Sequence, residues 1–214
     1  MSIGIFFDNE RDTVVDIREK LAEAFRLLSD NDLQSMVAVH LLCDSIRTPS
    51  DADERAAAYP INVVRNVARL HTTSRFLLIG DMDHLFSHGF EQKMRDLARR
   101  TLEMGKKRVL VYRFFEIEEE ESAKRHHKIT KADLRTLIEK EKAVVFHSKI
   151  NMTNGHDIPR LEEWLVTEEK ERPGISEGHL KYDRREWEPQ IVFTRDAPFH
   201  DETFPYRIRN NLEM

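Results

Sequence analysis

Short apolar segments alternate with longer amphipathic segments over the first 115 residues of the chain. The apolar segments, each of which predicts a strand, are 2–7, 35–43, 75–80 and 108–115. The segments between them, 13–28, a stretch that opens at Pro60, and 89–104, carry apolar side chains at helical spacing. This alternation predicts an α/β fold with a mainly parallel or mixed sheet and helices on both faces. Such sheets bind ligands at the carboxyl ends of their strands.

The second half of the chain carries weaker signals. Thr130 and Asp133 have the spacing of a capping box and predict a short helix. Residues 143–146 and 190–194 are predicted strands. Residues 116–128 contain five glutamates followed by a basic cluster, which is typical of a solvated loop or helix end. The continuous apolar pattern of 75–80 predicts a strand that is buried on both faces.

Composition excludes several classes of protein. The 214 residues suit one domain of ordinary size. A net charge of −5 without a basic stripe argues against a nucleic-acid partner. Cys43 is the only cysteine, so no intramolecular disulfide can form. The longest apolar run, 36–43, is interrupted by His40 and is too short to span a bilayer, and the N-terminus has no signal-like segment.

Two carboxylates follow the predicted strand 75–80. Asp81 and Asp83 share a face of an extended segment and repel each other unless a cation lies between them. Carboxylate oxygens suit Mg²⁺ or Mn²⁺, and such a metal keeps positions open for the oxygens of a diphosphate. The alternative is an ordinary loop in which one aspartate caps the next helix. His84 and His88, which come next, are expected in a solvent-exposed loop; the alternative is that His84 lies near the metal.

Several blocks of the sequence resemble glycosyltransferase family 49, which includes the LARGE-like enzymes and the β-1,4-glucuronyltransferase of α-dystroglycan glycan assembly. The resemblance is carried by YPINVVRNVAR (59–69) and RFLLIGDMDHLFSHGFEQKMR (75–95). It continues in RVLVYRFFEI (108–117), FHSKINMTNGHDIPRLEEW (146–164) and WEPQIVFTRDAPFHDETF (187–204). The divergence is similar to that of expanded nematode members. The resemblance implies a single GT-A-like domain over 1–214 that is incomplete at both ends.

What the resemblance implies is transfer of a sugar from a UDP-sugar to a hydroxyl of a glycan or glycoprotein, in the Golgi, with inversion. Asp81 and Asp83 fall on the D-x-D motif that holds Mn²⁺, or Mg²⁺, against the diphosphate. Membrane attachment would come only through an anchor that this chain does not contain. The alternative function is a catalytically inactive GT-A-like binding module or a truncated pseudoenzyme.

The resemblance also implies residues for the donor and for the acceptor proton. Asn62, Arg65 and Asn66 fall on the helix motif as donor-binding residues; with Arg69 they form one polar helix face. The alternative is a solvated face with its own ion pairs. An inverting mechanism needs a carboxylate base. The candidates are Glu188, Asp196, Asp201 and Glu202, and the last two are favoured because the family's D-E-x-F falls there.

Overall fold

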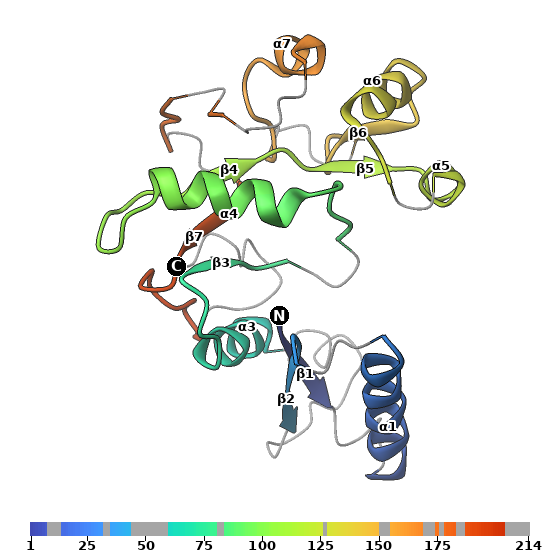
Figure 1. Cartoon of the computed structure of the whole chain (residues 1–214), viewed down its shortest axis with the longest axis vertical. Coiled ribbons are helices and arrows are strands. Elements are labelled where there is room, and N and C mark those ends of the chain that lie inside the picture. Colours follow the sequence, from blue (N-terminus) through green and yellow to red (C-terminus); the bar gives the residue numbers. More distant parts are fainter. Residues whose placement is uncertain are drawn as a thin grey trace. The chain divides into compact units, whose positions relative to one another are not determined.

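The computed structural model describes residues 1–7, 14–31, 35–43, 60–80, 84–125, 128–149, 155–168, 174–175, 178–182 and 187–203. The chain is a mixed α/β protein, as predicted, built from short sheets and helices (Figure 1). It divides into two compact units. The first comprises Met1–Ser74 together with Pro198–Met214, and the second comprises Arg75–Ala197.

The first unit contains a parallel pair of strands. β1 (Ser2–Phe7) lies beside β2 (Ala38–Cys43), with Ser2 opposite Ala38 and Phe7 opposite Cys43. Helix α1 (Val14–Asp30) connects them in sequence, which makes this the strand–helix–strand unit that the alternation predicts.

Helix α3 (Ile61–Leu70) packs against β1 in this unit, and the two elements lie together in Figure 1. The contact is close because position 4 is a glycine. A Cβ atom built on Gly4 would lie 2.8 Å from the carbonyl oxygen of Val64 and 2.7 Å from its Cγ1. Pro60 precedes the first residue of the helix rather than occupying it, so the helix starts one residue later than predicted.

The second unit contains an antiparallel sheet of three strands. β7 (Gln190–Thr194) lies between β3 (Phe76–Leu78) and β4 (Leu110–Tyr112). Helix α4 (Phe90–Thr101) covers this sheet. The core between helix and sheet is apolar and consists of Leu97, Ala98, Leu102, Leu110 and Val192.

The pairing of strands corrects two expectations. Only β1 and β2 are parallel among the described strands, and the other two described sheets are antiparallel, so the described strands do not form one mainly parallel sheet. β3 is an edge strand of its described sheet, and of its residues only Leu77 is buried, whereas its apolar sequence predicts burial on both faces. The apolar pattern does not identify the partner of β3, which is β7, more than a hundred residues later in the sequence.

The predicted strand 108–115 is divided into two. β4 pairs with β7, whereas β5 (Phe115–Ile117) pairs antiparallel with β6 (Ala143–Val145). The break falls at Arg113, whose guanidinium donates hydrogen bonds to the carbonyl oxygens of Ile158 and Pro159, each at 2.6 Å. These bonds fix the chain between two different strand partners.

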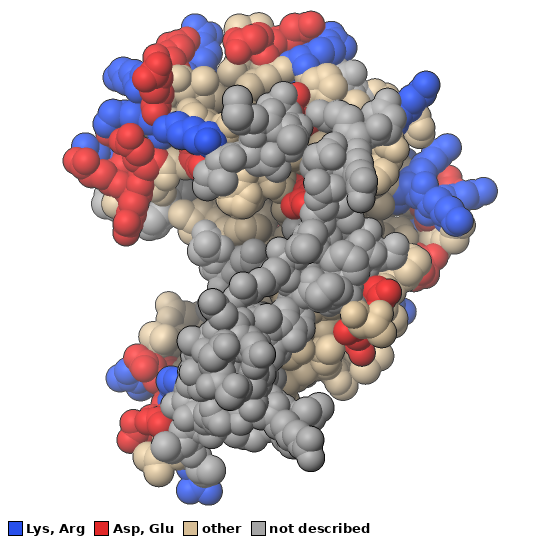
Figure 2. All heavy atoms as spheres, turned by 180° about the vertical axis from the view of Figure 1, so that it is seen from behind, with Lys and Arg blue, Asp and Glu red and all other residues tan. Residues whose placement is uncertain are grey.

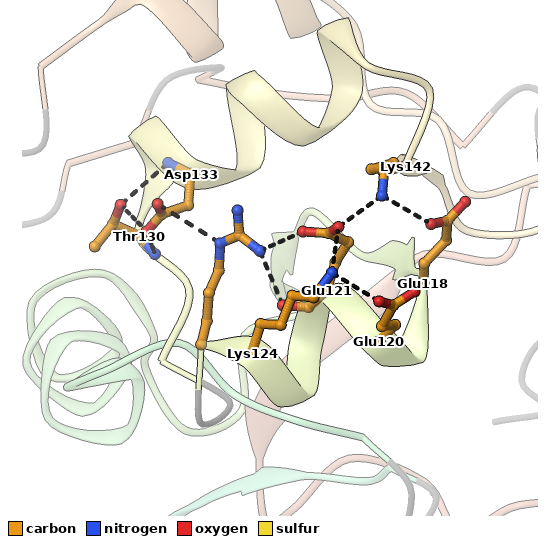
Figure 3. A network of polar contacts seen from close by, with 8 residues as sticks. Glu118, Glu120, Glu121, Lys124, Thr130, Asp133 and Lys142 are labelled. Atoms are coloured by element: carbon orange, nitrogen blue, oxygen red, sulfur yellow. Dashed lines mark hydrogen bonds and ion pairs between the residues drawn. The ribbon is translucent and has the colours of Figure 1, made fainter.

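In the acidic segment 116–128, which is predicted to be a solvated loop or helix end, Glu119 and Glu120 are exposed as expected, but Glu121 is buried. The segment contains α5 (Glu119–Lys124), and Figure 3 shows Glu121 between basic side chains. Lys142 Nζ donates to Glu121 Oε1 and Arg125 Nη1 to Glu121 Oε2, both at 2.6 Å. These bonds allow Glu121 to be buried, because each carboxylate oxygen has a charged partner.

Two further helices complete the second unit. α6 (Lys131–Glu139) begins at the predicted capping box, which is confirmed: Thr130 and Asp133 bond to each other's backbone N–H. α7 (Leu161–Val166) was not predicted. Trp164 on α7 packs with Leu134, Leu137 and Ala143 in a second apolar core.

Acidic and basic side chains are interspersed on the described surface seen in Figure 2, as the nearly balanced composition leads one to expect. Among the described residues, no helix is both long enough and apolar enough to cross a membrane.

Candidate functional site

The polar face of α3 is buried rather than solvated. Asn62, Arg65, Asn66 and Arg69 recur at helical spacing, and all four are buried together with Val64. Burying four polar side chains without hydrogen-bond partners would destabilise the folded state. The hydrogen-bond partners of Asn62, Asn66 and Arg69 come from a segment at the far end of the sequence, residues 198–203, which we call the C-terminal acidic loop.

Asn66 binds this loop through its whole side-chain amide. Its Oδ1 accepts a hydrogen bond from the backbone N–H of His200 at 2.9 Å, and its Nδ2 donates to the carbonyl oxygen of His200 at 2.8 Å. The same Nδ2 donates to Glu202 Oε1 at 2.9 Å. One asparagine therefore fixes both the backbone of the loop and one of its carboxylates.

Two other residues of the helix hold the loop on either side of Asn66. Asn62 Nδ2 donates to the carbonyl oxygen of Asp201 at 2.8 Å. Arg69 Nη1 donates to the carbonyl oxygen of Pro198 at 2.7 Å, and its guanidinium lies over the ring of Phe199, 4.7 Å from the centroid. The loop is thus attached along more than one turn of the helix.

The two carboxylates of the loop are held differently. Asp201 Oδ1 accepts hydrogen bonds from the backbone N–H of Thr203 at 2.8 Å and from its hydroxyl at 2.6 Å. These bonds lower the pKa of Asp201, because they favour the charged form. Glu202 instead receives its hydrogen bond from Asn66, across a sequence separation of 136 residues.

The side chain of His200, which directly precedes Asp201 in the loop, is only 5% exposed. Burial, and after it the positive charges of Arg65 and Arg69, lower the pKa of His200 to about 4. His200 is therefore neutral at physiological pH. Within the described residues, His200 Nδ1 and Asn62 Oδ1 are buried atoms without a hydrogen-bond partner.

Comparison with known proteins identifies the family to which the chain belongs. Residues 49–213, well over half of the chain, match the family described as glycosyl-transferase for dystroglycan, glycosyltransferase family 49. The chain belongs to this family. The match includes both α3 and the C-terminal acidic loop.

Individual family members are distant in sequence. The chain is 24% identical to the xylosyl- and glucuronyltransferase LARGE1 of Homo sapiens and to that of Mus musculus, over 68% of this chain. It is 23% identical to the same protein of Gallus gallus. The aligned region is only 18% of the length of each of these relatives.

The structure brings together five of the seven residues that the sequence singles out in this family member. Asn62, Arg65, Asn66, Asp201 and Glu202 all belong to the first unit, and the asparagines contact the acidic loop directly. Asp81 and Asp83 lie outside the described residues. In the part of the chain that is described, no three His, Cys, Asp or Glu side chains are grouped to hold a metal ion. The metal role of the two aspartates stays a prediction.

Two residues of the cluster were not among the predicted site residues. Arg69 continues the polar row of α3, so the helical period was the signal that could have included it. His200 directly precedes the two acidic residues, but its burial depends on α3 and has no signal in the local sequence. The expected exposure of His84 is wrong: His84 is half-buried against Phe114, with ring centroids 4.5 Å apart.

The second unit has a cavity of about 550 Å³ beside β6, lined in part by Phe146, Lys149, His156 and Asp157. His156 Nδ1 lies 2.7 Å from the carbonyl oxygen of Glu188, and burial lowers the pKa of this histidine. None of the five predicted site residues that the structure describes lines this cavity. We therefore place the candidate site at α3 and the C-terminal acidic loop.

Proposed function

We propose that this chain transfers a sugar from a UDP-sugar to a hydroxyl of a glycan acceptor, in the Golgi lumen, and inverts the anomeric centre. Membership of the family supports glycosyl transfer. The observation that carries the proposal is the bond between Asn66 and Glu202. It joins the helix motif to a carboxylate of the D-E-x-F block, the two sequence blocks in which the family resemblance places donor and acceptor chemistry.

Glu202 is the better of the two candidate bases. Both lone-pair directions of Asp201 Oδ1 are used by Thr203, and the pKa of Asp201 is lowered, which makes that carboxylate a weaker proton acceptor. Glu202 is held through one oxygen by a neutral amide. In the proposed reaction Glu202 takes the proton of the acceptor hydroxyl. The acceptor oxygen bonds to the anomeric carbon, and the bond from that carbon to the UDP oxygen breaks.

We propose that Arg65 and Asn62 contact the donor. A guanidinium supplies the charge and the planar set of donors that a diphosphate needs. Asn62 uses its amide nitrogen on Asp201 but keeps Oδ1 without a partner among the described residues, so it can accept from a hydroxyl or N–H of the nucleotide. These roles are independent of how Asn62 supports the loop.

Asp81 and Asp83 are the proposed ligands for Mn²⁺ or Mg²⁺. They fit such a cation because they supply two hard oxygen donors, separated by one residue, shortly after the end of β3 in the sequence. When bound, the cation neutralises the charge that develops on the departing diphosphate. The protein's own contribution is to hold the donor through Arg65 and to accept the proton at Glu202.

The test is a donor panel on the purified chain. The names of the LARGE1 relatives make UDP-xylose and UDP-glucuronic acid the first donors, each assayed with Mn²⁺, Mg²⁺ or EDTA and a panel of methyl glycosides. We expect release of UDP that requires the metal and increases with one acceptor. Binding of UDP without turnover would support the inactive binding module instead, and no binding of UDP would exclude both.

A further inference from the structure

We infer that Asn66 is a positioning residue that orients the carboxylate of Glu202, and that it is not a ligand for the donor nucleotide. The inference rests on the proposed function, since it concerns how the proposed base is held. It also changes the role that the sequence motif assigns to Asn66.

The hydrogen-bonding capacity of Asn66 is the first argument. An asparagine amide has two N–H donors and one carbonyl oxygen. Both donors are used inside the protein, one on the carbonyl oxygen of His200 and one on Glu202 Oε1. The oxygen accepts from the N–H of His200. No donor of Asn66 remains for a phosphate or a ribose oxygen.

The orientation of the amide is the second argument. If nitrogen and oxygen exchanged places, the oxygen would face the carbonyl of His200 and the carboxylate of Glu202, and the nitrogen would face an N–H. All three contacts would then become repulsive. The backbone of His200 therefore fixes the plane of the amide, and this plane fixes the direction in which its second N–H meets Glu202.

Burial makes this arrangement rigid. Asn66 is 6% exposed and lies on the helix that packs against β1. Little water can compete for its donors, and the helix backbone restricts its rotamers. The bond holds Glu202 through Oε1 and leaves Oε2 for another proton. Because the amide is neutral, it positions the carboxylate without pairing its charge.

A double-mutant cycle tests the positioning role. Asn66→Ala should lower kcat by about tenfold or more while changing KM for the donor much less, which is the pattern for an interaction that acts on the reaction step. In a Glu202→Gln background the same change should lower kcat by no more than about twofold, because coupled residues do not add. Full additivity would overturn the proposal.

Asn62→Ala is the matched control. Asn62 lies on the same helix and bonds to the same loop, but to the backbone of Asp201 and to no carboxylate. Whatever it costs, its effect on kcat should be the same in the parent and in Glu202→Gln. If Asn66→Ala does not fold, an NMR titration of the parent and of Glu202→Gln, which needs no change at Asn66, replaces the cycle.

The cycle also separates the two proposals. A Glu202→Gln variant with parental kcat would exclude Glu202 as the base, and the positioning role with it, while transfer itself would stand. A parent chain that releases no UDP from any donor would overturn the proposed function.

The contact has a readout that needs no turnover. In an NMR titration, the side-chain amide protons of Asn66 should shift as Glu202 ionises, and Glu202→Gln should abolish that shift. The other groups near Asn66 that titrate or carry charge are Asp201, His200, Arg65 and Arg69. Asp201→Asn and His200→Gln identify their contributions. An Asn66 amide that does not respond to Glu202→Gln would overturn the inference.

Discussion

Asn66 Nδ2 lies 2.9 Å from Glu202 Oε1, although 136 residues separate the two in the chain. This bond explains why a helix motif rich in asparagine and arginine occurs together with an acidic block near the end of the sequence. The helix holds the acidic loop through the backbone of Pro198, His200 and Asp201 and directs one carboxylate. The main structural role of the polar face of α3 is thus to hold this loop.

Asp83→Asn should weaken binding of UDP in the presence of Mn²⁺. The variant loses the charge of one proposed metal ligand, and the loss should exceed the ~10- to 100-fold that is typical when an outer partner of a metal site is removed. Calorimetric titration with Mn²⁺ and with EDTA measures it. Asp96→Asn, an exposed aspartate of α4, is the control. Equal affinities of Asp83→Asn and the parent would exclude the metal role.

Gly4→Ala should destabilise the protein by about 1–3 kcal/mol, the usual cost of overpacking. The added methyl would lie 2.8 Å from the backbone oxygen of Val64, which cannot move without shifting α3. Gly178→Ala is the matched control, because no atom lies within 4 Å of its Cβ position. Urea unfolding measures both. Equal stability of the two variants would show that β1 and α3 are not packed as described.

Glu121→Gln should lower the melting temperature near pH 7 and change it little near pH 2. Hydrogen bonds from Lys142 and Arg125 lower the pKa of Glu121 to about 2. Because this pKa is lower in the folded state than the ordinary glutamate value of about 4.5, ionised Glu121 stabilises the folded state at pH values above 4.5. This stabilisation disappears as the pH falls from 4.5 towards 2. Glu120→Gln is the control, since Glu120 is exposed and pairs with Lys124. Parallel melting curves for Glu121→Gln and the parent at all pH values would contradict this role.

Local patterns predicted most of the elements well. β7 has the predicted bounds, α1 lies within two residues and α4 within three residues of the predicted bounds, and the capping box at Thr130 is present. These features depend on neighbours in the sequence, such as an apolar period or a side chain three residues away. The capping box forms whatever lies elsewhere in the fold.

Features set by distant partners could not be predicted in this way. The sequence identifies Asn62, Arg65, Asn66 and Arg69 as one face, but a polar face is read as solvated or ligand-binding. Its burial depends on a loop whose sequence shows no link to the helix. β3 was expected inside a parallel sheet because its apolar pattern does not specify which strands lie beside it. Glu121 is buried because Lys142, 21 residues later in the sequence, pairs with its carboxylate.

His200→Gln should flatten the pH dependence of stability between pH 6.5 and pH 4. In the folded protein burial, and then the charges of Arg65 and Arg69, lower the pKa of His200 to about 4, whereas in the unfolded chain it stays near 6.5. The unfolded state therefore binds more protons in this interval, and stability must rise with pH across it. Above 6.5 both states are neutral, and below 4 both are charged, so the contribution of His200 is constant on either side.

The parent should lose about 1–3 kcal/mol more than His200→Gln between pH 6.5 and pH 4, on the scale of about 1.4 kcal/mol for each unit of pKa difference. Urea unfolding at pH 7, 6, 5 and 4 measures the difference between the two proteins. Carboxylates that titrate in the same interval contribute to both curves and cancel. The backbone bonds of His200 to Asn66 remain in the variant, so the loop stays attached. Curves that stay parallel from pH 7 to pH 4 would show that His200 is not buried beside the two arginines.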